Sequence, residues 1–163
     1  MKALVVYYSR VFTTRLVALS IARDLGADVE LLVESKKRSG PGPLRHLTED
    51  IDARRGKLTS IHVKSSPQDY DLIVIGTPLL FGRITPEVRA YLASQNLEGR
   101  KVGFFLIGDE GETVKAVGEL KRLAAKSTFV GSMTVTEKEL KNGTYILKIR
   151  PFVDSLKQEQ PGA

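Results

Sequence analysis

The chain contains no cysteine, no tryptophan and only two histidines, His46 and His62. Without cysteine it forms no disulfide, no thiolate zinc site and no iron–sulfur cluster, and it cannot use a cysteine nucleophile. Two histidines argue against a histidine-based metal site. Both histidines lie in a basic segment of the sequence, so no Ser–His–Asp set is evident.

Long apolar runs and early glycines are also missing. No run approaches the roughly 20 apolar residues that span a bilayer. The start of the chain, Met1-Lys2 and then a strand pattern, does not resemble a signal peptide, so we expect a cytoplasmic protein without a membrane partner. No glycine lies between Met1 and Leu25, which excludes a G-x-G-x-x-G dinucleotide fingerprint and a Walker P-loop after the first strand.

The 163 residues (18.0 kDa) suit one domain, and 42% hydrophobic residues suffice for an ordinary core. We expect a single domain over 1–163 with a basic insertion at about 35–68. The 25 Lys+Arg exceed the 19 Asp+Glu by six, and eight basic against three acidic residues between Lys36 and Lys64 account for five of that excess. A solvated surface is the favoured interpretation of this segment. Nucleic acid is an unlikely partner because no binding signature or interleaved aromatics accompany the charge.

Short apolar runs alternate with helical patterns, which predicts a doubly wound α/β fold with a five-stranded parallel sheet. The predicted strands are Ala3–Tyr8, Asp28–Val33, Asp71–Gly76, Lys101–Ile107 and Phe129–Val135. Helices are predicted at about 14–25, from Thr85-Pro86 onward, along a stripe at Val114, Val117, Leu120, Leu123 and Ala124, and at 151–156. Asn142-Gly143 indicates a tight turn or hairpin before Tyr145–Leu147.

Ligands on such sheets bind beyond the carboxyl ends of the strands. The loops at Ser9–Thr14, Thr77–Arg83 and Ile107–Gly111 are therefore the candidate site. The first loop leads into a helix, whose N–H groups and dipole suit a phosphate, with Ser9, Thr13 and Thr14 as hydroxyl donors. The alternative is that Thr13 or Thr14 simply caps the helix.

The other two loops also allow a plain structural explanation. Pro78 and Gly82 can be ordinary turn residues. Asp109 and Glu110, which follow Gly108, can stabilise the start of a helix near Glu112.

These loops resemble those of the flavodoxin family. After its first strand that family carries S/T-x-T-G-x-T, which Ser9 and Thr14 match at the ends while Val11 and Phe12 replace the inner Thr and Gly. The stretch from Asp71 to Gly82, DLIVIGTPLLFG, resembles the family's third strand and flavin loop. The resemblance implies a flavodoxin-like sheet with helices on both faces and FMN as cofactor. It assigns cofactor contacts to Ser9, Arg10, Val11, Phe12, Thr13, Thr14, Thr77, Pro78, Leu79, Leu80, Phe81, Gly82, Gly108 and Asp109.

The implied function is FMN-dependent electron transfer, or NAD(P)H-linked reduction of a small acceptor such as a quinone. No catalytic side chain is needed, because the flavin performs the redox chemistry. The basic charge suits an acidic redox partner protein. The alternative is a flavodoxin fold that has lost FMN and acts as a binding or regulatory domain, which Val11, Phe12, Asp109 and Glu110 motivate.

Overall fold

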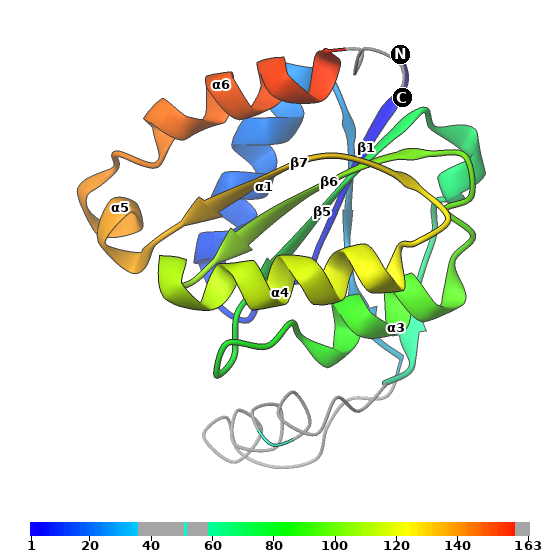
Figure 1. Ribbon diagram of the computed structural model, residues 1–163, viewed down its shortest axis with the longest axis horizontal. Helices are drawn as coiled ribbons and strands as arrows, with labels where there is room; N and C mark the ends of the chain where they lie inside the picture. The colour runs from blue at the N-terminus through cyan, green and yellow to red at the C-terminus, as the bar shows by residue number, and fades with distance from the viewer. Residues whose placement is uncertain (36–50, 52–58, 159–163) are drawn as a thin grey trace.

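A computed structural model of the protein describes residues 1–35, 51 and 59–158, and its centre is a five-stranded parallel sheet (Figure 1). The strand order is β2-β1-β5-β6-β7. The strands are β1 (Ala3–Tyr7), β2 (Asp28–Leu31), β5 (Leu72–Pro78), β6 (Lys101–Ile107) and β7 (Thr128–Val135). The predicted doubly wound α/β class and all five predicted strands are thereby confirmed, with small differences in their ends.

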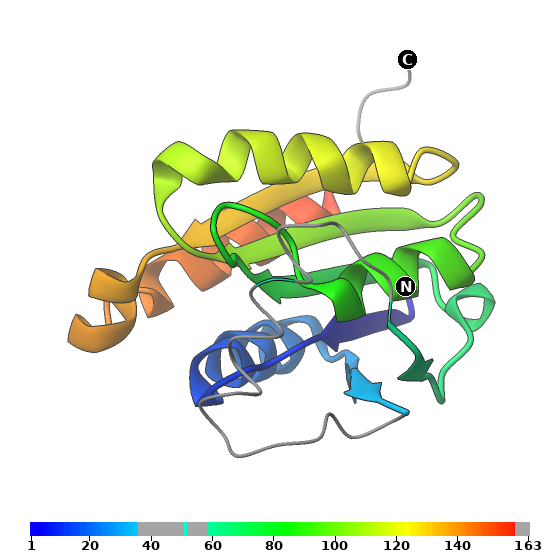
Figure 2. The same ribbon diagram turned by 90° about the horizontal axis from the view of Figure 1, so that it is seen from below.

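Helices cover both faces of the sheet (Figures 1 and 2). On one face lie α1 (Phe12–Leu25) and α6 (Ile146–Lys157), and on the other lie α3 (Pro86–Ser94) and α4 (Glu110–Leu123). The short α5 (Glu137–Asn142) follows β7, and a 3-10 turn, η1 (Pro67–Asp69), precedes β5. All five residues of β1 are buried because alternate side chains enter the two cores. Both faces of the sheet are therefore buried beneath helices, as is usual for parallel sheets.

The second predicted strand is divided in the structure. β2 ends at Leu31, although the Leu32 N–H still donates to the Tyr7 carbonyl at 2.8 Å. The chain then leaves the main sheet, and β3 (Val33–Glu34) pairs antiparallel with β4 (Ile61–His62). The apolar run of the sequence could not show this, because a change of pairing partner leaves no trace in residue type.

The hairpin interpretation at Asn142-Gly143 is wrong. Gly143 has φ 77° and ends α5, and the following residues enter α6 rather than a strand. A left-handed glycine serves a helix end as well as a hairpin turn, so the sequence signal was ambiguous.

The predicted stripe on α4 is partly wrong as well. Val114 is 82% exposed, whereas Thr113, Ala116 and Leu120 are buried. The other four predicted positions lie in or against the core, so Val114 is the one misplaced member of the stripe. The helix begins at Glu110 rather than near Glu112.

Most of the predicted basic insertion lies outside the described residues. This applies to residues 36–50 and 52–58, and the tail at 159–163 also lies outside the described residues. Within the part of the chain that is described, no helix has both the length and the apolar character needed to cross a bilayer.

Candidate functional site

Three loops meet at the carboxyl edge of the sheet and enclose a hollow of about 330 Å³. They follow β1, β5 and β6, which are neighbours in the sheet. The sheet order changes direction between β1 and β5, and such switch points are where open α/β sheets bind ligands. The hollow, hereafter the three-loop hollow, is lined by Arg10, Val11, Thr13, Thr14, Pro78, Leu79, Ile107, Gly108, Asp109, Glu112, Glu137 and Leu140.

The structure brings most of the proposed cofactor residues to this hollow, but not all. Those that line it are Arg10, Val11, Thr13, Thr14, Pro78, Leu79, Gly108 and Asp109. Those that do not line it are Ser9, Phe12, Thr77, Leu80, Phe81 and Gly82. Two of the second group have other contacts: the Ser9 hydroxyl donates to the Val11 carbonyl, and the Phe12 ring lies 5.8 Å from the Arg15 guanidinium.

The start of α1 has free capacity for an anion. Val11 is the N-cap residue, and it has no side-chain acceptor for the first N–H groups of the helix. Thr13 and Thr14 lie inside the first turn rather than at the cap, so the capping interpretation of these two residues is wrong. The first turn carries no acidic residue. An anion in the hollow would face unpaired N–H groups and the positive end of the helix dipole.

The loop after β5 forms a tight two-residue turn. The Leu80 N–H donates to the Arg83 carbonyl at 2.8 Å, and the Arg83 N–H donates back at 3.0 Å. The two central residues, Phe81 and Gly82, have φ of 50° and 70°, as in a type I′ turn. Positive φ costs a bulky residue about 1 kcal/mol. Phe81 is nevertheless held there with 57% of its surface exposed, which is typical of ligand-binding loops.

Thr77 has a structural position rather than one facing the hollow. It is fully buried, and its hydroxyl accepts from the Thr85 N–H at 3.3 Å and donates to the Pro78 carbonyl at 2.8 Å. Thr85 in turn accepts from the Val88 N–H and caps α3, with Pro86 as the first helical residue. The predicted helix start is therefore confirmed. Thr77 joins the end of β5 to this cap and so holds the two ends of the loop together.

Carboxylates gather on one side of the hollow. Asp109 and Glu112 come from the start of α4, and Glu137 comes from α5. Asp109 occupies the N-cap position of α4 without making a side-chain cap bond. Sequence reasoning named Glu112 only as the start of a helix. It missed Glu137 because nothing in the pattern indicated that α5 contributes to this hollow. The hollow thus has a cationic end at α1 and Arg10 and an anionic side at α4 and α5.

A partly buried ion cluster joins the turn to α3 and α4. Glu119 on α4 accepts from Arg83 at 3.3 and 3.4 Å and from Arg89 on α3 at 2.8 and 3.2 Å. Burial by itself raises the pKa of Glu119, but the hydrogen bonds from Arg89 and Arg83 outweigh it and the pKa is lowered. Glu119 therefore stays ionised at neutral pH.

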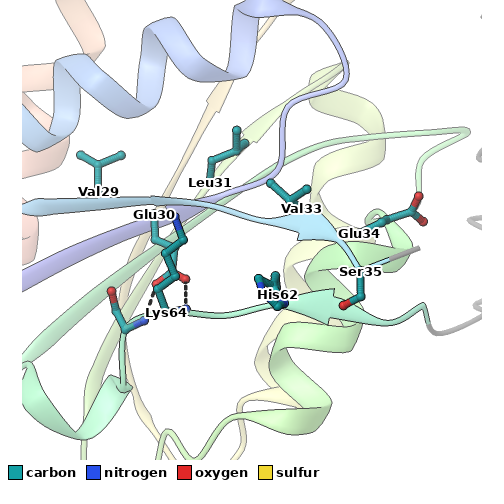
Figure 3. A pocket seen from close by; sticks show the side chains of 9 residues that line it. Val29, Glu30, Leu31, Val33, Glu34, Ser35, His62 and Lys64 are labelled. Carbon is teal, nitrogen blue, oxygen red and sulfur yellow. Dashed lines mark hydrogen bonds between the residues drawn. The ribbon is translucent and has the colours of Figure 1, made fainter. Parts of the chain in front are cut away.

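A second hollow, of about 500 Å³, lies at the β2 edge of the sheet (Figure 3). Exposed Val29, Leu31 and Val33 form one wall. Buried Glu30 accepts from the backbone N–H groups of Lys64 and Ser65, which ties β2 to the chain after β4. No residue proposed from the sequence lies here. Among the described residues, no group of three or more histidine or acidic side chains is placed to hold a metal ion.

Comparisons with known proteins identify only the fold, because the similar structures share 20% or less of their sequence with this chain. No protein-family model and no curated protein matches the chain. A flavoprotein from Lactobacillus acidophilus NCFM, solved in complex with FMN, is similar with a TM-score of 0.68 and 18% identity, over 88% of this chain and 98% of that one. A flavodoxin from Streptococcus pneumonia TIGR4 is similar with a TM-score of 0.57 and 20% identity, over 96% and 97% of the two chains. Flavodoxin 1 from Bacillus cereus has a TM-score of 0.57 and 14% identity, over 96% and 97%. The protein therefore has a flavodoxin-like fold.

Proposed function

We propose that the protein binds FMN in the three-loop hollow and transfers electrons. The observation that carries this proposal is the start of α1, which opens into the hollow at the switch point of the sheet without a side-chain cap. A phosphate would supply the missing acceptor for these N–H groups. The likeness to a flavoprotein solved with FMN supports the same ligand.

The residues present fit both ends of this ligand. Thr13, Thr14 and Arg10 would hold the phosphate, and Leu79, Gly108 and Asp109 would face the ring from the other two loops. Phe81 does not line the hollow, but it is exposed and lies two residues beyond Leu79, where its ring would supply an apolar surface at this end of the ligand. The flavin, when bound, supplies the one- or two-electron redox chemistry. The chain itself binds, orients and shields it.

The partner that we propose is an acidic redox protein. The alternative reaction is NAD(P)H-linked reduction of a small acceptor. The formal charge of +6 favours attraction of an acidic surface. Association of this kind slows as the ionic strength rises. We also propose that the protein works in the cytoplasm.

The test is a flavin titration followed by fluorescence quenching and by the visible spectrum after removal of excess ligand. We expect FMN to be retained with a flavin absorption band and to bind more tightly than riboflavin, which lacks the phosphate. Thr13→Ala should weaken FMN binding by about tenfold or more, because it removes one hydrogen bond to a charged group. It should leave riboflavin binding unchanged. Thr128→Ala, an exposed threonine at the start of β7, is the matched control.

A colourless protein that binds neither flavin would refute the proposal. That result would favour the alternative, a fold that has lost its cofactor and acts as a binding or regulatory domain.

A further inference from the structure

The turn from Leu80 to Arg83 is held in place by contacts with α4, at Glu112 in the wall of the hollow and at Glu119 outside it. Its tip rests on α4, since a Cβ placed on Gly82 would lie 3.4 Å from the Glu112 side chain. Its last residue, Arg83, donates two hydrogen bonds to Glu119, which lies about two turns further along the same helix. The position of the turn therefore depends on α4 at two points.

Glu119 is itself fixed by a second arginine. Arg89 on α3 is 6% exposed and donates from Nε and Nη2 to one Glu119 oxygen. The side chains of Arg89 and Glu119 are 7% and 13% exposed, so this pair is largely shielded from water, whereas the Arg83 side chain is 33% exposed. Charged hydrogen bonds in such surroundings are strong and geometrically specific. The cluster thus joins the turn, α3 and α4 into one unit.

We infer that Glu119 is a positioning residue for the flavin ring: through Arg83 it holds the turn that carries Phe81 at the edge of the three-loop hollow. Glu119 does not line the hollow and would not touch the ligand. This inference rests on the proposed function for the identity of the ligand. The position of the turn is a property of the protein alone and is tested without any ligand.

The first measurement is hydrogen exchange of the ligand-free protein. Glu119→Gln removes the charge. We expect the amides of Leu80 and Arg83, each of which donates to the other residue's carbonyl, to exchange about tenfold faster. Amides of α1 and of β5 should be unchanged. Glu98→Gln, an exposed acid beyond the end of α3, is the control. If Glu119→Gln fails to fold, Arg83→Gln leaves the Arg89–Glu119 pair intact and should give the same exchange pattern.

The second measurement is flavin affinity. We expect Glu119→Gln to weaken FMN and riboflavin about tenfold each, because the ring end is disturbed and the phosphate end is not. The double variant Glu119→Gln with Arg83→Gln should bind both flavins no more weakly than either single variant does. Unchanged exchange at the turn, or faster exchange with wild-type affinity for both flavins, would overturn the inference. If the wild-type protein binds no flavin, the proposed function fails, whereas the exchange result still decides whether Glu119 positions the turn.

Discussion

Replacing Gly76 by alanine tests how tightly the end of β5 is packed beneath the site. Gly76 lies opposite Phe105 on the neighbouring strand β6. A Cβ at Gly76 would be 1.9 Å from Phe105 Cζ, 2.2 Å from Cε1 and 2.6 Å from Cε2. Carbon atoms pack at about 3.5–4.0 Å, so the fully buried ring must move by about 1.5 Å or more. The Gly in this position therefore admits a core aromatic ring, not a ligand.

Overpacking costs about 1–3 kcal/mol, and the size of this overlap places Gly76→Ala at about 3 kcal/mol of lost unfolding free energy. Phe105→Leu removes the overlapping ring atoms and by itself should cost about 2 kcal/mol. In the double variant the clash is gone. Its loss of unfolding free energy should therefore be about 2 kcal/mol smaller than the sum of the losses in the two single variants. Urea unfolding followed by circular dichroism measures each value.

The control is Gly118→Ala in α4, where a new Cβ meets no atom within 4 Å. Its helical position predicts a gain of up to about 1 kcal/mol. A loss below about 1 kcal/mol for Gly76→Ala, or additive costs in the double variant, would refute the packing argument.

Two further predictions concern charge. The pKa of Glu139 is lowered by hydrogen bonds from the Lys148 side chain and the Thr136 N–H. The ionised Glu139 contributes about 1 kcal/mol to stability above its unfolded-state pKa, and this contribution is lost as the pH falls through its lower folded-state pKa. The stability difference between wild type and Glu139→Gln should therefore shrink from pH 6 to pH 3. A difference that stays constant over this range would contradict the prediction. In the flavin-loaded protein, Asp109→Asn should raise the potential for forming the anionic reduced flavin on the order of tens of millivolts, whereas the distant Asp154→Asn should not; spectroelectrochemistry decides.

Local signals in the sequence predicted most of the sheet. β1, β5 and β6 are continuous runs of apolar residues, which only a strand buried on both faces requires. The start of α3 was equally clear, because Thr85 and Pro86 combine a capping hydroxyl with a residue suited to the first helical position. Helix ends marked by glycine were less certain, as Gly143 shows, because left-handed glycine serves several kinds of turn.

The candidate site was predictable only in outline. Position at strand ends located the three loops, since parallel strands bring their carboxyl ends to one edge. The direction of individual side chains was not predictable. Thr77 turns inward to Thr85, Phe12 lies beside Arg15, and Glu137 reaches the hollow from a helix that follows another strand. Each of these depends on a contact between distant parts of the chain.

The sequence by itself determined the class of fold, the three loops that line the hollow and the absence of cysteine and thiolate chemistry, because composition and hydrophobic periodicity are local properties. Only the tertiary structure decided what individual residues do. Gly76 makes room for Phe105, Glu119 gathers Arg83 and Arg89 from separate elements, and the start of α1 lacks a side-chain cap. These assignments follow from packing and charge pairing between residues far apart in sequence, and residue type alone carries no record of such pairs.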